Sequence, residues 1–300
     1  MKDLSGDLQA FYRRQRLSWP AFDRACRDLR KIKYREFEVS GAHFVVQFNP
    51  TRKKNVEVAE KEDLCALCPE HLPPEQEAMP YGESFLLLCN PRPIFPYHFT
   101  IASRCHERQS IFGREQLLLK VARDLGPSFA VFYNGPRSGA SLPHHFHFQA
   151  CPFSLLPLSR ENAGKPGVFL VKGRARRYFY LRGKDERKVA SHIGKLISAW
   201  QEVSGEEGEP MLNLIASFDD GNWHVYLFPR LAHRPQRFFL EGEARLIVTP
   251  GAVEMGGVLV TVYEEDFFRL DGKMIEEIMG DVLAGEKTLE RIDLRFKCRE

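Results

Sequence analysis

The stretch that decides how this chain is interpreted is Asn134-Gly-Pro-Arg-Ser-Gly-Ala-Ser-Leu-Pro-His-His-Phe-His-Phe-Gln-Ala150. An apolar run at residues 129–133 precedes it and predicts a buried strand, and a loop rich in Gly, Ser and Pro follows. Residues 145–151 then alternate polar with apolar, and side chains alternate faces along a strand. Three ligand-capable side chains are therefore predicted to share one face: His145, His147 and Gln149. This pattern is typical of a site, and hydrogen-bonded core or surface histidines are the alternative.

The bulk composition indicates a globular protein that can bury a proper core. Its 300 residues suit one large domain or two fused ones, with 43% hydrophobic and 28% charged residues. A net charge of +3 is too balanced to favour a nucleic-acid or membrane partner. The first residues lack the apolar segment of a signal peptide, and no apolar run approaches a membrane span. With seven cysteines, we expect reduced thiols in the cytoplasm, with metal binding favoured over disulfides.

The remaining chain is predicted to combine short strands with a few helices. Helices are expected within residues 4–33, 109–125, 186–203 and 264–283. Strands are expected in a hairpin over 36–48, and at 84–89, 98–103, 129–133, 145–151, 168–171, 177–181, 211–217 and 223–228. A polar bridge at 159–167 separates two halves. The predicted division is a helical extension, a catalytic half with the metal site, and a second half: 1–35, 36–158 and 168–300.

Two segments of these halves compare closely. Residues 98–106 and 224–233 both run in the order histidine, strand, arginine, histidine, with the same spacing from His98 to Arg104 as from His224 to Arg230. An internal duplication is the hypothesis that follows. The second half has neither a Cys-x-x-Cys nor a His-x-His-x-Gln sequence, so it would be catalytically silent.

A metal site is predicted from cysteine and histidine spacing. Cys65 and Cys68 are separated as in a zinc half-site, although two chance cysteines or a redox pair are alternatives. A redox pair would follow a thioredoxin-like strand, whereas the flanks here are charged and rich in proline. With His106, at the end of a strand, and His145 they complete a Cys2His2 tetrahedral set. Such a metal would stiffen the strand that carries His147, which is a structural role.

The histidine strand suits transfer of a phosphorus-centred group. A neutral imidazole can attack phosphorus and form a phosphoramidate, and His147 is the predicted nucleophile. The Gln149 amide can donate to a phosphate oxygen, and the loop at 135–141 offers backbone N–H groups, hydroxyls and a guanidinium. The candidate substrate-binding residues are Asn90, Asn134, Arg137, Ser138, Gly139, Ser141, Arg230 and Arg234. The two arginines of the second half could equally belong to a solvated basic turn.

His145-Phe-His147-Phe-Gln149 resembles the His-x-His-x-Gln signature of the transferase branch of the histidine-triad superfamily. That branch includes galactose-1-phosphate uridylyltransferase, diadenosine tetraphosphate phosphorylase and GDP-L-galactose phosphorylase. The segments at 90–101, 250–260 and 265–270 resemble the same branch, so the resemblance covers about residues 40–285. It implies an α+β fold of duplicated histidine-triad-like halves, each an antiparallel sheet with packed helices, forming an intramolecular pseudo-dimer. It also implies a nucleotidylated His147 and a structural zinc ion on Cys65, Cys68, His106 and His145.

The predicted function is that of a nucleotidyltransferase or phosphorylase acting on a nucleoside diphosphate sugar. It would pass a nucleoside monophosphate from His147 to phosphate or to a sugar phosphate. Phosphorolysis or hydrolysis of a dinucleoside polyphosphate is the alternative within this class, and a zinc-stabilised nucleotide-binding protein without turnover is the alternative outside it. A role in nucleic-acid repair is disfavoured by the balanced charge and the absence of a basic tail. A monomeric pseudo-dimer and a homodimer both stay open.

Overall fold

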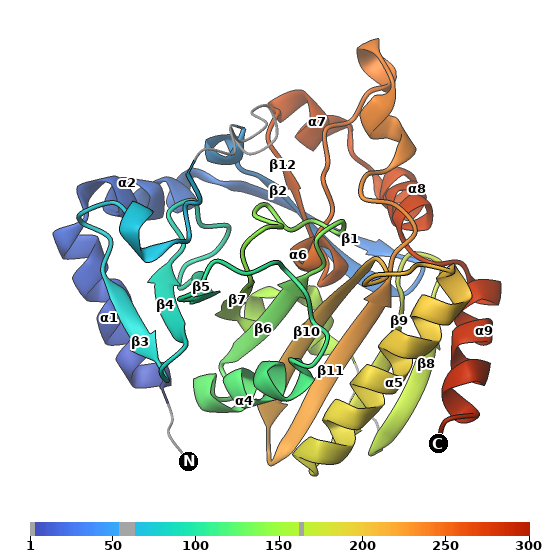
Figure 1. The fold of residues 1–300 in the computed structure, drawn as a ribbon. Coiled ribbons are helices and arrows are strands. Elements are labelled where there is room, and N and C mark those ends of the chain that lie inside the picture. Colours follow the sequence, from blue (N-terminus) through green and yellow to red (C-terminus); the bar gives the residue numbers. More distant parts are fainter. Residues whose placement is uncertain (1–3, 54–63, 162–164) are drawn as a thin grey trace.

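A computed structural model describes residues 4–53, 64–161 and 165–300 (Figure 1). Its strands are β1 (Lys33–Val39), β2 (Ala42–Phe48), β3 (Ala78–Tyr81), β4 (Phe85–Cys89), β5 (Phe99–Ser103), β6 (Phe129–Asn134), β7 (His147–Pro152), β8 (Gly167–Lys172), β9 (Arg177–Gly183), β10 (Leu212–Asp219), β11 (Asn222–Pro229) and β12 (Val258–Thr261). Its α-helices are α1 (Ser5–Ser18), α2 (Pro20–Asp28), α4 (Glu115–Leu125), α5 (Glu186–Ser204), α6 (Ala252–Met255), α7 (Glu264–Arg269), α8 (Gly272–Val282) and α9 (Glu286–Lys297). None of the helices in these ranges is long and apolar enough to cross a membrane.

Nine strands form one antiparallel sheet that contains two related halves. The order is β3-β4-β5-β7-β6-β10-β11-β9-β8, so that β4-β5-β7-β6 and β8-β9-β11-β10 repeat the same arrangement. Each half has one long helix, α4 or α5, after its second strand in the chain. The halves meet where β6 pairs with β10. This confirms the predicted α+β fold of duplicated halves with antiparallel sheets and packed helices.

The pairing shows which residues of the halves correspond. The ladder between β6 and β10 is centred on Phe132 opposite Ile215, and a two-fold axis through this centre superposes the two residues. In their hairpins they pair with Gln149 and Tyr226 respectively. His147, two residues before Gln149, therefore corresponds to His224.

The predicted alignment of residues 98–106 with 224–233 is wrong, because β5 and β11 are not equivalent strands, although the duplication itself is confirmed. β5 corresponds to β9, and β11 corresponds to β7. In the second half the loop before the histidine strand is replaced by a tight turn of two residues, Asp220 and Gly221, both with positive φ. Such a turn matches the twist of a hairpin and leaves no room for a phosphate-binding loop.

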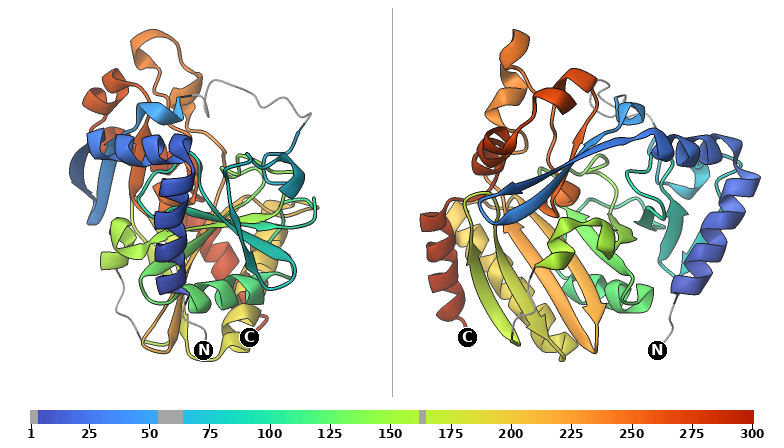
Figure 2. Two further views of the ribbon diagram at one scale, coloured as in Figure 1. Left: turned by 90° about the vertical axis from the view of Figure 1, so that its left-hand side faces the viewer. Right: turned by 180° about the vertical axis from the view of Figure 1, so that it is seen from behind.

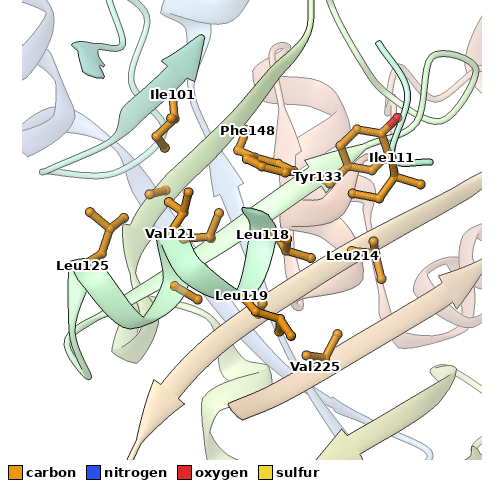
Figure 3. Close-up of a cluster of buried hydrophobic side chains, with 14 of the residues drawn as sticks. Ile101, Ile111, Leu118, Leu119, Val121, Leu125, Tyr133, Phe148, Leu214 and Val225 are labelled. Atoms are coloured by element: carbon orange, nitrogen blue, oxygen red, sulfur yellow. The ribbon is translucent and has the colours of Figure 1, made fainter. Parts of the chain in front are cut away.

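Helices cover one face of the large sheet, and a three-stranded sheet covers the other (Figures 1 and 2). α1, α4, α5 and α9 pack on the first face, where Leu118, Val121 and Leu125 of α4 are buried against Ile101 and Phe148 as their helical spacing predicts (Figure 3). On the opposite face lie α6, α8 and the small sheet β1-β2-β12, in which β12 pairs with β2 in parallel. His147 and Gln149 belong to this second face, because Phe148 between them points into the first core.

Two differences between predicted and observed element boundaries bear on the site. The helix expected over 109–125 begins at Glu115, because Gly113 takes a φ of 74° and interrupts helical geometry. The strand expected over 145–151 begins at His147, so His145 lies before it. The bridge predicted at 159–167 lies between β7 and β8, and its residues 162–164 fall outside the described residues.

Candidate active site and metal centre

His147 is held as a neutral imidazole with its proton on Nδ1. Nδ1 lies 2.9 Å from the carbonyl oxygen of His145, and a carbonyl only accepts, so Nδ1 donates. Burial lowers the pKa of His147 to about 4. At neutral pH the ring therefore keeps a lone pair on Nε2, the form that can attack phosphorus.

His98 orients the side-chain amide of Gln149. The backbone N–H of Ile94 donates to Nδ1 of His98 at 3.2 Å, which leaves the ring proton on Nε2. Nε2 then donates to Oε1 of Gln149 at 2.8 Å, so the amide nitrogen of Gln149 is turned the other way. Burial, reinforced by the charge of Arg52, lowers the pKa of His98 to about 3 and keeps it neutral. His98 was not predicted as a site residue, although strand alternation places it on the face of Thr100, which pairs with Gln149.

A buried network holds the loop between β6 and β7. Asn213 donates to Oδ1 of Asn134 at 2.8 Å and to the carbonyl of Ser138 at 2.7 Å. Arg230, which is 0% exposed, donates to Oδ1 of Asn213 at 2.5 Å. The backbone N–H of Ala252 also donates to Asn134. Asn134 and Arg230, both predicted to bind substrate, therefore hydrogen-bond within the protein and support the loop.

The other predicted loop residues differ in their surroundings. Ser138 is buried, and its hydroxyl has no hydrogen-bond partner among the described residues. Gly139 has a φ of 96°, and a Cβ there would lie 2.7 Å from Cα of Gly251, so only glycine fits. Arg137 forms an ion pair with Glu206, and Ser141 is exposed.

Two predicted residues lie at other contacts. Oδ1 of Asn90 accepts the backbone N–H of Arg92 at 3.0 Å, which shapes the turn before β5. The guanidinium of Arg234 lies over the ring of Phe238, 4.1 Å from its centroid. In the described ranges no hydrogen bond connects Arg234 to the loop at 135–141.

Arg52 and Glu254 join the site without having been predicted. Nη1 of Arg52 donates to the carbonyl of Arg92 at 2.6 Å. The positive charge of Arg52 acts to lower the pKa of both His98 and Glu254. Glu254 is buried, and its Oε2 accepts the backbone N–H of Gly251 at 2.7 Å. Burial raises the pKa of Glu254 to about 7, against the positive charges of Arg52 and Arg230. A glutamate within the apolar run at 252–262 was the available signal.

The four predicted metal ligands converge. The ligand atoms of Cys65, Cys68, His106 and His145 all lie within 4.8 Å of one another. Nδ1 of His145 is 3.3 Å from Sγ of Cys65 and 3.6 Å from Sγ of Cys68, which is 3.2 Å from Nδ1 of His106. Tetrahedral bonds of about 2.0–2.3 Å separate ligand atoms by about 3.3–3.8 Å, so this cluster could hold a metal ion. Nε2 of His145 donates to the carbonyl of Ser103 at 2.8 Å, which leaves the Nδ1 lone pair facing the cysteines.

A known enzyme shares this fold. The structure is similar to yeast Ap4A phosphorylase Apa2 in complex with AMP, with a TM-score of 0.60 and 14% identity over 92% of this chain and 96% of that chain. It is also similar to the same enzyme in complex with Ap4A, with a TM-score of 0.59 and 16% identity over 93% and 98% of the two chains. Residues 11–152 match the sequence profile described as Domain of unknown function (DUF4922). No curated protein matches the sequence.

The chain therefore shares the fold of an Ap4A phosphorylase, and its large sheet contains two related halves. The resemblance to the transferase branch of the histidine-triad superfamily, which was based on a few short motifs, is confirmed at the level of the fold.

Proposed function

We propose that the protein is a nucleotidyltransferase of the phosphorylase kind, in which His147 carries a nucleoside monophosphate. The observation that carries this proposal is the hydrogen bond from Nδ1 of His147 to the carbonyl of His145, in a ring kept neutral by burial. It leaves Nε2 as a nucleophile at neutral pH without a separate base.

The proposed reaction has two displacements. In the first, Nε2 of His147 attacks the phosphorus of the nucleotide, and the bridging P–O bond breaks with its electron pair leaving on the departing phosphate oxygen. In the second, an oxygen of inorganic phosphate or of a sugar phosphate attacks the same phosphorus, and the N–P bond breaks to restore neutral His147. The amide nitrogen of Gln149, fixed by His98, would donate to a non-bridging oxygen in both steps. The hydroxyl of Ser138 and the backbone of its loop would bind the same phosphate.

Two substrate classes fit this chemistry. A nucleoside diphosphate sugar is the first, because the motif has Gln149 in its third position as the transferase branch does. A dinucleoside polyphosphate is the second, and the likeness to the phosphorylase in complex with Ap4A favours it. Both contain a nucleotide whose phosphorus bears a phosphate leaving group, so the first displacement is the same for both.

We further propose that residues 36–158 form the catalytic half and residues 168–300 the supporting half, with 1–35 as an extension. The metal at Cys65, Cys68, His106 and His145 would be zinc, because two thiolates with two imidazoles are a common zinc set. All four coordination positions would be taken by protein ligands, which is typical of a structural site. It would hold the segment before β7 in place and supply no chemistry to the reaction.

The test is intact-protein mass spectrometry after brief incubation with Ap4A or with a panel of nucleoside diphosphate glucoses. The wild type should gain the mass of one nucleotidyl group, which is a nucleoside monophosphate less one water, and His147→Ala should gain none. His224→Ala is the matched control, since His224 occupies the corresponding position of the second half, and it should label like the wild type. Equal labelling of His147→Ala, or no labelling of folded, metal-loaded protein by any donor, would contradict the proposal.

A further inference from the structure

One buried glutamine forms hydrogen bonds with both backbone groups of His147, the N–H and the carbonyl. Gln109 is 3% exposed and lies in the segment between β5 and α4. Its Oε1 accepts the backbone N–H of His147 at 2.8 Å, and its Nε2 donates to the carbonyl of His147 at 2.9 Å. The same Nε2 donates to the carbonyl of Asn134 at 3.0 Å.

The side-chain amide of Gln109 lies where the pairing between β6 and β7 ends. The ladder ends with Phe132 opposite Gln149, and continuing its register by two residues would oppose Asn134 to His147. These two residues are the last of β6 and the first of β7, from which the loop leaves and returns. The side chain of Gln109 therefore replaces direct pairing at this position and sets the separation of the two loop stems.

The position of Gln109 is itself fixed from both halves. Its backbone N–H donates to the carbonyl of Pro143 in the loop at 3.2 Å. Two residues further, the N–H of Ile111 donates to Oε2 of Glu209 at 2.6 Å, and the hydroxyl of Tyr133 donates to Oε1 of the same carboxylate at 2.8 Å. Glu209 comes from the second half, just before β10.

We propose that Gln109 is a positioning residue for the nucleophile: its amide fixes the backbone of His147, and through it the direction of Nε2. This inference deepens the proposed function and rests on His147 being the attacking group. The role requires one acceptor and two donated hydrogen bonds from the same side chain, and only an amide supplies both. A carboxylate of the same shape still accepts the N–H of His147. Its second oxygen, however, would face the carbonyl oxygens of Asn134 and His147, and these would be repelled.

Gln15→Glu is the control for Gln109→Glu. Gln15 is also a buried glutamine whose amide accepts from one backbone N–H and donates to one backbone carbonyl. Gln15 is 0% exposed, accepts the N–H of Glu77 at 3.0 Å and donates to the carbonyl of Glu75 at 3.1 Å, within the N-terminal extension and β3 region. Both variants should lower the melting temperature. Only Gln109→Glu should slow adduct formation, by about 100-fold in kcat with KM little changed, since misplacing a reacting group costs about that much.

A second readout does not depend on turnover. In protein labelled with 15N-histidine, the wild type and Gln15→Glu should show His147 as the neutral Nδ1–H tautomer at pH 7, and Gln109→Glu should show a mixture of tautomers. A Gln109→Glu variant with the wild-type tautomer and the wild-type rate of adduct formation would overturn the inference. Absence of any adduct on the wild type would instead count against the proposed function, and the tautomer would still decide the role of Gln109.

Discussion

At the scale of single residues, the site depends on which nitrogen of each histidine carries the proton. For His147, His145 and His98 a backbone group decides this. A carbonyl holds the proton on Nδ1 of His147 and on Nε2 of His145, and an amide N–H places it on Nε2 of His98. The spacing of the motif selected His145 and His147 as candidates, and it did not select His98. It could not predict these protons, because the orientation of a carbonyl depends on strands that are distant in the sequence.

Glu254 should make the stability of the protein depend on pH. Burial raises its pKa from 4.5 to about 7, although Arg52 and Arg230 oppose the shift. The folded carboxyl holds its proton more tightly than the unfolded one, so its favourable contribution is present below about pH 4.5 and is lost as the pH rises to about 7. Glu254→Gln keeps an acceptor for Gly251 and cannot ionise. The free energy of unfolding of the variant, measured relative to that of the wild type, should increase by on the order of 2–3 kcal/mol as the pH rises from 5 to 8. Thermal unfolding at each pH measures it.

Taking the difference in stability between the variant and the wild type cancels the contributions of the other titrating groups. Burial lowers the pKa of His98, His147 and His233, which makes stability rise with pH in the acid range, but these groups are the same in both proteins. Glu241→Gln, at an exposed position, is the control and should follow the wild-type curve. Parallel curves for Glu254→Gln and the wild type would show that the carboxyl does not titrate in this range.

At the scale of elements, hydrophobic periodicity predicted most strands and helices, and it was wrong where a segment is held by a distant partner. Residues 109–114 have an amphipathic sequence that continues into α4, yet in the fold they form an irregular segment with a turn at Phe112 and Gly113. Their polar groups bond to Glu209 and to the backbone of His147, and neither is near them in sequence. Periodicity reports which face is apolar, and it does not report such contacts.

The metal cluster should stabilise the segments that it joins, because its ligands come from three separate parts of the chain. Cys65 and Cys68 precede β3, His106 follows β5, and His145 precedes β7. We expect one zinc ion per wild-type chain by native mass spectrometry and none in Cys68→Ser. The variant should melt at least about 5 °C lower, since about 1 kcal/mol corresponds to about 2–4 °C for a chain of this size.

Cys298→Ser is the matched control for loss of a thiol, because Cys298 is exposed and lies near the end of the chain. It should retain the ion and the wild-type melting temperature. A chelator should lower the melting temperature of the control and of the wild type, and leave that of Cys68→Ser unchanged. Full zinc content in Cys68→Ser would exclude Cys68 as a ligand.

At the scale of the whole molecule, the second half supports the site of the first. It has a tight turn in place of the loop, and it supplies Asn213 and Arg230 to hold the loop of the first half. The sequence predicted a duplicated fold with a silent half, from the missing motifs. It could not predict that Arg230 would bond to Asn213, because this contact exists only once β10 lies beside β6.

Asn213 should control the order of the loop without controlling the fold. Asn213→Asp keeps the acceptor for Arg230 and loses the donor to Asn134 and to the carbonyl of Ser138. Two lost hydrogen bonds of about 1 kcal/mol each should make local opening about 30-fold more frequent. Amide hydrogen exchange of residues 135–141 should accelerate by that factor, and the exchange of β6 should stay slow.

Asn222→Asp is the corresponding change in the second half. Asn222 is 2% exposed and donates to the carbonyl of Asp220 at 2.8 Å, within the turn that replaces the loop. Its substitution should accelerate exchange at that turn and leave residues 135–141 unaffected. Unchanged exchange of the loop in Asn213→Asp would contradict this prediction. The loop would then be held by its packing against Gly251, and the hydrogen bonds of Asn213 would not determine its order.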